Sequence, residues 1–111
     1  MAYNEKLATR MREALSDLHQ VEEKKMFGGL AFMIDHKMCI TVGADRIMCR
    51  IDPALHEEAI KRTGCSTVIM GGRVYRGYVH VNEDAIKTQK DFNYWVALAL
   101  DFNKTAKASK K

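Results

Sequence analysis

The stretch KKMFGGLAFMIDHKMCITVG, residues 24–43, decides the fold of this chain. The larger apolar residues Leu30, Phe32 and Ile34 alternate with Ala31, Met33 and Asp35, and Met38, Ile40 and Val42 alternate with Cys39 and Thr41. The short polar segment Asp35-His36-Lys37 connects the two runs. Successive side chains of a strand point to opposite faces, so each alternating run predicts a strand. Asp35 favours a tight turn because its side chain can bond its own backbone. The stretch therefore predicts a β-hairpin that begins at a double glycine.

Outward from this hairpin, turn residues mark the neighbouring strands. Gly43-Ala44-Asp45 leads into the alternating run RIMCRI, residues 46–51, which completes a three-stranded meander. On the other side of the hairpin, the charged residues 22–25 are interpreted as a break between elements. Further along, Gly71-Gly72-Arg73 predicts a tight turn between two β segments, STVIM and VYRGYVHV. These connections are short, so the strands that they join are antiparallel.

Three helices are predicted from capping residues and apolar spacing. The first covers residues 3–19, with Asn4 as its N-cap. The second covers residues 53–63, because Asp52 suits the N-cap position and proline suits the first helical position. The third covers about residues 91–104. We expect an α+β domain of two layers, with about five antiparallel strands and the element order α-β-β-β-α-β-β-α.

The charge of the chain is concentrated at its end. The formal net charge is +4, and four lysines among residues 104–111 account for all of it, so residues 1–103 are neutral. We expect one domain over residues 1–103 and a basic, disordered tail over residues 104–111. No apolar run approaches the roughly 20 residues of a membrane-spanning helix, and the first residues lack the apolar core of a signal peptide. We therefore expect a cytoplasmic protein.

The double glycine Gly28-Gly29 does not have the surroundings of a phosphate site. A phosphate loop lies between a strand and a helix, whereas here an alternating strand follows the glycines. A dinucleotide-binding fingerprint is excluded for the same reason. We interpret Gly28-Gly29 as a bend or bulge where a side chain would collide with neighbouring backbone, and we expect no cofactor.

The three cysteines are poor candidates for chemistry. Cys39, Cys49 and Cys65 lack the paired spacing of a structural zinc site, and no motif supplies an activating base for a thiolate. Cys39 is expected on the strand face opposite Met38 and Ile40, and Cys49 is expected in the core. No Ser-His-Asp or paired-carboxylate arrangement follows from spacing. We expect no metal and no enzymatic activity; a thiol or metal protein built on the cysteines stays open as a weaker alternative.

Arginines and tyrosines of the later strands form a softer candidate binding site, which consists of Arg46, Arg50, Arg73, Arg76, Tyr75 and Tyr78. Guanidinium groups beside aromatic rings hold phosphate or stack on bases, and the same residue types are enriched in protein interfaces. A third interpretation is an exposed sheet edge kept soluble by arginine. Because residues 1–103 are neutral, contact with a protein is favoured. Nucleic acid, bound through the arginines and the lysine tail, stays open as the alternative.

Several short motifs are shared with a known family. They are Met26-Phe27-Gly28-Gly29 followed by an aromatic strand, the strand that ends in Arg50-Ile51-Asp52, Gly71-Gly72, Gly77-Tyr78-Val79, and Trp95 in the closing helix. On these motifs the chain resembles, over roughly residues 3–103, the N-terminal domain of the TfoX/Sxy family, bacterial proteins tied to natural competence. The resemblance implies an α+β sheet domain and positive regulation of competence genes in concert with a cyclic-AMP-responsive activator. It carries no established catalytic residues.

The chain departs from the two-domain members of that family. Those members continue into a C-terminal domain that resembles helical DNA-associated modules, whereas this chain ends in lysines soon after the first domain. We therefore expect a stand-alone N-terminal domain. Its expected function is that of a non-enzymatic regulatory or adaptor domain, which acts by protein–protein contact.

Overall fold

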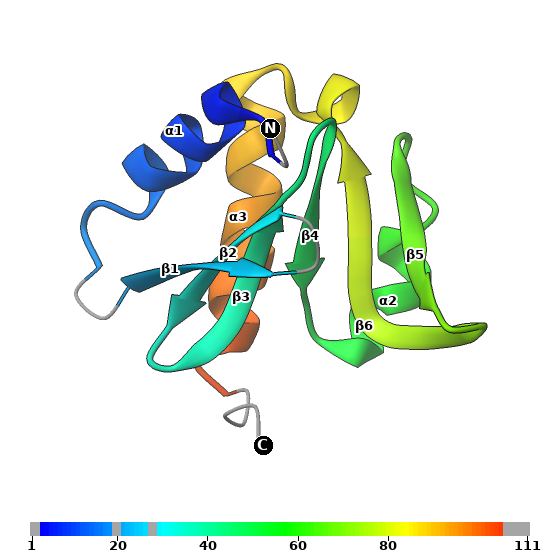
Figure 1. Ribbon diagram of the computed structural model, residues 1–111. Coiled ribbons are helices and arrows are strands. Elements are labelled where there is room, and N and C mark those ends of the chain that lie inside the picture. Colours follow the sequence, from blue (N-terminus) through cyan, green and yellow to red (C-terminus); the bar gives the residue numbers. More distant parts are fainter. Residues whose placement is uncertain (1–2, 19–20, 27–28, 106–111) are drawn as a thin grey trace.

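The computed structural model describes residues 3–18, 21–26 and 29–105. Within these ranges the strands are β1 (Val21–Met26), β2 (Gly29–Ile34), β3 (Lys37–Val42), β4 (Arg46–Arg50), β5 (Cys65–Met70) and β6 (Arg73–Asn82), and the α-helices are α1 (Glu5–Ala14), α2 (His56–Ala59) and α3 (Gln89–Asn103). The strands form one antiparallel sheet in the order β1-β2-β3-β4-β6-β5. Helices α1 and α3 pack behind β2, β3 and β4, and α2 packs behind β5 and β6 (Figure 1). The predicted α+β class and antiparallel sheet are confirmed.

The strand that the sequence pattern did not reveal is β1, at one edge of the sheet. It pairs with β2 from Val21 opposite Ile34 to Met26 opposite Gly29. Residues 22–25, interpreted from the sequence as a break, are all exposed. Edge strands carry charge because charged side chains discourage pairing with other chains. The charge run therefore marks an edge strand, which lacks the alternation of apolar residues that identifies inner strands.

Both predicted hairpin turns are two-residue turns with left-handed backbone. Asp35 and His36 have φ angles of 54° and 65°, and Gly71 and Gly72 have φ angles of 59° and 78°. Two central residues with positive φ define a type I′ turn, whose twist matches that of the flanking strands. Lys37 and Arg73, predicted to lie in the turns, are the first residues of β3 and β6.

The placement of Cys39 opposite both Met38 and Ile40 is wrong. The pairing of β2 with β3 shifts, so that Met33 lies opposite Met38 while Phe32 lies opposite Ile40, and Cys39 is the extra residue between them. Such a β-bulge changes which face the following side chains point to. Cys39 and Ile40 therefore both belong to the core beneath the helices, and Met38 points to the other face.

Two of the three predicted helices are shorter than expected. The Asn4 side chain caps α1 as predicted, accepting from the amides of residues 6 and 7, but α1 ends at Ala14 instead of residue 19. The amide and hydroxyl of Ser16 both bond the carbonyl oxygen of Glu13, and this local bonding competes with the helix. Leu18, which follows the end of α1, is 39% exposed.

The second helix begins as predicted and ends early. Asp52 accepts from the amide of Ala54 and opens a short 3-10 helix, Pro53–Leu55, which continues into α2. After α2 the chain makes turns up to Gly64, whose φ is 81°. Residues 61–63 are exposed, so no apolar side chain ties a longer helix to the core. Helix α3 agrees closely with its prediction.

The main core lies between the sheet and the helices. Its largest fully buried members are Phe32, Phe92, Leu7, Met11, Ile40, Ile47, Ile51 and Ile86. The β2–β3 hairpin also holds the end of α3: Lys37 Nζ donates to the Asn103 carbonyl oxygen at 2.6 Å, and Asn103 Nδ2 donates to the Ile34 carbonyl oxygen at 3.3 Å. A cation at a helix C-terminus complements the helix dipole.

The structure supports the steric interpretation of the double glycine at one of its two positions. A Cβ atom on Gly29 would lie 2.5 Å from the carbonyl oxygen of Val42 in the adjacent strand. Phe27 and Gly28 lie outside the described residues, and Met26 and Gly29 are the last and first residues of β1 and β2. Across the described part of the chain, no helix is long and apolar enough to span a membrane.

Candidate interaction surface

The face of the sheet opposite the helices has an apolar centre rich in methionine. Five buried residues form this second cluster: Ala31, Met33, Met38, Met48 and Val68, with Tyr78 packed against them. They come from β2, β3, β4, β5 and β6. We call this side of the sheet the helix-free face, a name that refers to the described residues. Methionine is an adaptable side chain that is common at binding surfaces.

Five of the six predicted binding residues occupy strand positions on the helix-free face. Arg46 and Arg50 lie two residues before and two residues after Met48 in β4, so their strand positions are on the same face as Met48. Tyr78 lies opposite Arg50, and the Arg50 guanidinium carbon is 5.8 Å from the centre of the Tyr78 ring. The same carbon is 5.5 Å from the centre of the Phe102 ring of α3, so the Arg50 side chain extends toward the helix side of the sheet. Near the turn of the β5–β6 hairpin, Tyr75 lies opposite Val68 of the apolar centre.

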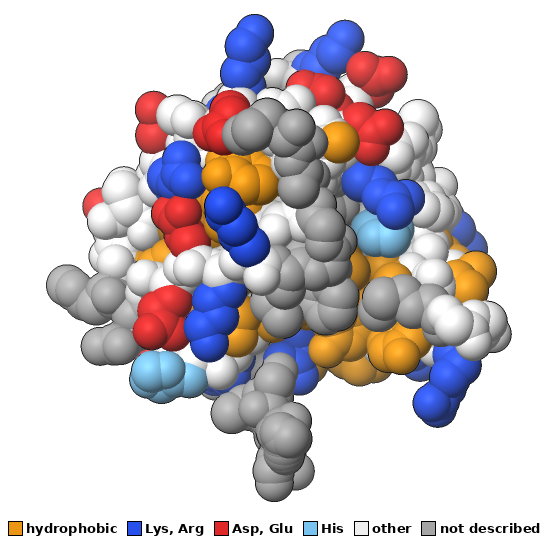
Figure 2. Space-filling view, in the orientation of Figure 1, with side chains coloured by type: hydrophobic (Ala, Val, Ile, Leu, Met, Phe, Trp, Pro, Cys, Tyr) orange, Lys and Arg blue, Asp and Glu red, His pale blue; other side chains and the backbone are white. Residues whose placement is uncertain are grey.

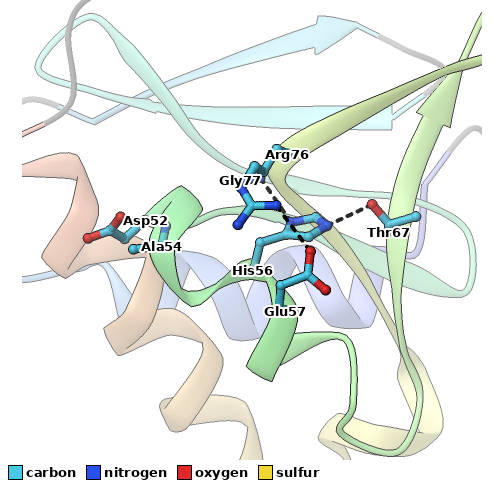
Figure 3. A network of polar contacts seen from close by, with 7 residues as sticks. All are labelled: Asp52, Ala54, His56, Glu57, Thr67, Arg76 and Gly77. Atoms are coloured by element: carbon cyan, nitrogen blue, oxygen red, sulfur yellow. Dashed lines mark hydrogen bonds and ion pairs between the residues drawn. The ribbon is translucent and has the colours of Figure 1, made fainter.

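The sixth residue, Arg76, points to the helix side of the sheet. Its guanidinium donates to the carboxylate of Glu57 in α2 at 3.0 Å (Figure 3). Both side chains are more than half exposed, so this ion pair contributes little to stability. Arg73 precedes Tyr75 by two residues and lies on the helix-free face with it. The structure thus brings together Arg50, Tyr75 and Tyr78. Arg46, opposite Asn82, and Arg73 occupy the same face at opposite ends of β6, and Arg76 is separated from all of them.

A bulge in β6 brings the two tyrosines together. In a regular strand, residues three apart point to opposite faces. Here the pairing of β5 with β6 passes from Thr67 opposite Val79 directly to Val68 opposite Tyr75, so that three residues of β6, 76–78, have no partner in β5. The rings of Tyr75 and Tyr78 meet edge to face with their centres 6.1 Å apart. The bulge is therefore what makes one surface out of the two tyrosines.

His56 of α2 holds this bulge in place (Figure 3). The backbone amide of Gly77 donates to Nδ1 of the buried His56 at 2.9 Å, so Nδ1 carries no proton. The other ring nitrogen, Nε2, therefore carries the proton and donates to the Thr67 hydroxyl at 2.8 Å. One side chain thus links α2 to both strands of the hairpin.

Only glycine fits at the centre of the bulge. Gly77 has a φ of 92°, and a Cβ atom there would lie 3.1 Å from the Ile51 carbonyl oxygen. The Gly77 carbonyl oxygen in turn accepts from the Ile51 amide at 2.7 Å. The close approach of these two backbones and the positive φ both require the absence of a side chain.

The turn end of the β5–β6 hairpin, next to Gly71-Gly72, exposes a group of large apolar side chains. Ile69 is 59% exposed, its strand partner Val74 is 62% exposed, and Tyr75 is 36% exposed. Figure 2 shows hydrophobic side chains gathered at the lower right, over this hairpin. We call Ile69, Val74 and Tyr75 the hairpin surface. Adjacent residues of a strand point to opposite sides of the sheet, so Val74 lies on one side and Tyr75 on the other. The turn end of the hairpin is therefore apolar on both sides.

His80 and Arg46 form the electrostatic part of the helix-free face. His80 lies opposite Met48, beside the strand position of Arg46. Partial burial and the positive charge of Arg46 lower the pKa of His80, in that order of importance. The imidazole is therefore neutral near pH 7 and offers hydrogen bonds without charge.

The cysteines lie in surroundings that suppress thiolate formation. Burial raises the pKa of Cys39 to about 12, although the charges of Arg50 and Lys37 act in the opposite direction. Burial also raises the pKa of Cys65 to about 11 and that of Cys49 well above its ordinary value. Reactive thiols need a lowered pKa. Within the residues that the structure describes, no group of three His, Cys, Asp or Glu side chains is placed to hold a metal ion.

Sequence reasoning missed His56, His80 and the exposed pair Ile69 and Val74. His56 could have been noticed as a histidine in the first turn of a capped helix, but nothing local indicates that its ring reaches two strands. His80 lies between Val79 and Val81, a pattern typical of an ordinary solvent-facing residue in a strand. Ile69 and Val74 have the apolar character of core residues. They are exposed because β5 is an edge strand and because the start of β6 extends beyond its pairing with β4, which covers only residues 78–82.

Comparison with known proteins adds one finding. The model of the family described as the TfoX N-terminal domain matches residues 13–103, which is most of the chain. No curated protein and no solved structure matches the chain.

Proposed function

We propose, because the chain belongs to the TfoX N-terminal domain family, that it is a regulatory or adaptor domain without enzymatic activity, which acts by binding another protein. The resemblance of its motifs to those of competence regulators supports a regulatory role. The fold supplies a rigid sheet, and the side chains that project from its far hairpin supply the contact.

The observation that carries this proposal is the hairpin surface. Ile69, Val74 and Tyr75 expose large apolar side chains at one end of the sheet, and Tyr78 and Arg73 lie beside them. Exposed apolar groups that gather in one place mark interaction sites, whereas single ones are ordinary. Tyrosine and arginine are also the residue types that contribute most to binding in protein interfaces.

The absence of enzymatic activity is a further part of the proposal. The three thiols have raised pKa values, and the buried imidazole of His56 is engaged by Gly77 and Thr67. A general base must reach a substrate proton, and a buried ring with both nitrogens bonded does not. These features support a binding module over a catalyst.

An affinity-capture experiment tests the proposal. The purified chain is immobilised, and proteins from a lysate of the cells that encode it are captured at physiological salt and compared with those held by Val74→Asp and Tyr75→Ala. The matched control is Leu18→Asp, which places the same charge at an exposed apolar residue far along the chain. We expect one partner that the wild type and the control retain and that both hairpin variants lose. Equal capture by all four proteins, or turnover of a metabolite by the pure chain, would contradict the proposal.

Binding of nucleic acid is a second candidate, which one observation favours. The Arg50 guanidinium lies beside Tyr78, whose ring meets that of Tyr75, and aromatic rings beside guanidinium groups suit stacked bases. Arg46 and Arg73 occupy positions on the same face at the two ends of β6. The double variant Arg46→Ala/Arg73→Ala should weaken binding of fluorescent single-stranded DNA and RNA, and Arg76→Ala, on the other side of the sheet, should not. Binding that depends on these arginines must also fall steeply with salt. Equal affinity of the wild type, the double variant and Arg76→Ala would exclude this face as the site.

A further inference from the structure

The two edges of the sheet differ sharply in charge. The strand order makes β1 and β5 the edge strands. Residues 22–25 of β1 are two glutamates and two lysines, all exposed, and Glu23 also pairs with Arg12 of α1 at 2.8 Å. A row of charges is how proteins protect a sheet edge against pairing with another chain. The β1 edge is protected in this way.

The β5 edge has no such protection. Its sequence, Cys-Ser-Thr-Val-Ile-Met, contains no charged residue, no proline and no glycine, and it is rich in residues that favour strands. No strand among the described residues lies beyond β5, so its outward N–H and C=O groups face away from the sheet. The bulge that interrupts the β5–β6 pairing is in β6, so β5 itself stays extended. The edge is therefore suited to accept another strand.

Positive charges stand at both ends of this edge. Lys61 and Arg62 precede β5 and Arg73 follows it across the turn, and all three are exposed. The Arg62 guanidinium lies 4.1 Å from the centre of the Tyr94 ring, and within the described ranges Lys61, Arg62 and Arg73 form no ion pair. Asp84 and Asp91 line the same pocket as Lys61 and Arg62 and partly offset the positive charge at that end. A strand with acidic ends would complement this arrangement.

The same charges argue against a second copy of the chain as the occupant. A two-fold dimer through β5 would pair the two strands antiparallel, which places Arg73 of one copy beside the region of Lys61 and Arg62 of the other. Like charges placed together in this way oppose association. A different polypeptide with acidic residues meets no such repulsion.

We propose that β5 is a docking edge, to which an extended segment of a partner protein adds as a further strand, with apolar residues at alternate positions and acidic residues at both ends. This inference rests on the proposed function and names the kind of segment that the partner supplies. Backbone hydrogen bonds to β5 provide affinity, and Ile69, the exposed residue of β5, contacts side chains on one side of the added strand. Val74 and Tyr75 of β6 lie one strand further in and extend the apolar surface behind Ile69.

A synthetic peptide tests the docking edge directly. The probe has a Thr-Val-Thr-Val-Thr core with two glutamates at each end, and its binding is followed by NMR shifts and amide exchange of the 15N-labelled chain. Two control peptides share its core: one carries methyl groups on alternate backbone nitrogens, and the other has lysines in place of the glutamates. We expect the probe to slow amide exchange in β5 and each control peptide to bind at least about tenfold more weakly, since one lacks backbone donors and the other repels the arginines.

Variants of the chain complete the test. Ile69→Asp should weaken binding of the probe at least about tenfold, and Leu18→Asp should leave it unchanged, while circular dichroism verifies that both proteins are folded. The proposal is overturned if the probe does not bind, if N-methylation has no effect, or if the changed shifts lie away from residues 65–75. It is also overturned if sedimentation shows a dimer of the free chain that Ile69→Asp dissociates, because the occupant is then a second copy.

The two proposals fail in different ways. Partner capture that depends on Tyr75, together with no binding of the probe, leaves the adaptor function standing and removes the docking edge. Binding of the probe at β5, together with no captured partner, leaves the edge standing and removes the adaptor function.

Discussion

Replacement of Gly29 by alanine tests whether close packing of backbone holds the start of β2. The added methyl group would lie 2.5 Å from the Val42 carbonyl oxygen, 3.3 Å from the Val42 carbonyl carbon and 3.4 Å from Cγ2 of Thr41. Val42 pairs with Leu30 in the centre of the sheet, so its carbonyl group has little freedom to move. Relief of the collision requires the first residue of β2 to separate from β3.

The expected loss of stability is about 2 kcal/mol. Overpacking of a core costs roughly 1–3 kcal/mol, and a collision with backbone belongs near the upper end of that range. Alanine also restricts the unfolded chain, which returns about 0.4–1 kcal/mol. For a chain of 111 residues, an unfolding entropy of about 2.1 cal/mol/K per residue converts 2 kcal/mol into a fall in Tm of roughly 9 °C.

Gly71→Ala is the matched control for this experiment. Gly71 has a φ of 59° and no atom within 4 Å of an added Cβ, so alanine there meets backbone strain without collision and should cost about 1 kcal/mol. Asparagine tolerates this backbone, so Gly71→Asn should recover stability while Gly29→Asn should not. Urea unfolding followed by circular dichroism measures the wild type and all four variants. A Gly29→Ala protein within 0.5 kcal/mol of the wild type, a margin typical of neutral surface changes, would refute the steric reasoning.

Three other features give testable predictions: the bond between His56 and Gly77, the Asn4 cap and the buried thiols. His56→Ala should lower the free energy of unfolding in urea by about 3 kcal/mol, because the buried amide of Gly77 loses its acceptor and a cavity opens; His56→Asn, which can still accept, should recover part of the loss. Asn4→Ala should cost about 1 kcal/mol in thermal unfolding, whereas Asn4→Asp, which keeps a capping oxygen, should lose less. With pKa values raised from 9.0 to about 12 for Cys39 and about 11 for Cys65, both thiols should react slowly with a disulfide reagent at pH 8 and quickly in denaturant. Because these pKa values are higher in the folded state, the stability they contribute is intact below pH 9 and should fall as pH rises from 9 toward 12, by at most about 1.4 kcal/mol per pH unit for each thiol; urea unfolding that is constant from pH 8 to 11 would contradict this.

Much of the fold could be predicted because the decisive signals are local. Asp52 and Asn4 act as helix caps where the sequence places them, and Gly71-Gly72 forms the turn that its residues favour. Each of these effects depends on a few neighbouring residues. The charged strand β1 was missed since its identity depends on its position at the edge, which no short segment reveals.

The bulges explain most of the remaining differences. The extra residue at Cys39 moves that side chain into the main core, and residues 76–78 of β6 place Tyr75 and Tyr78 on one face. A bulge depends on contacts from distant elements, such as the bond from the Gly77 amide to His56. Alternation in the sequence assumes a regular strand and therefore assigns the wrong face wherever a bulge occurs.

The candidate site was predicted by residue type more successfully than by arrangement. Five of its six residues occupy strand positions on the helix-free face, but only Arg50, Tyr75 and Tyr78 are in contact. Arg76 points to the other side, where it pairs with Glu57 of α2. The apolar hairpin surface was not predicted, because Ile69 and Val74 resemble core residues until the strand order is known.

The contrast between the two sheet edges also limits the size of any assembly. A fibre grows when the surface gained at each addition can receive the next subunit, which here would require β5 of one copy to pair with β1 of the next. The four charges of β1 oppose that head-to-tail contact. Complexes formed through β5 should therefore end after one addition and have a fixed stoichiometry, so an apolar, uncharged strand can stay exposed on this protein without making it polymerise.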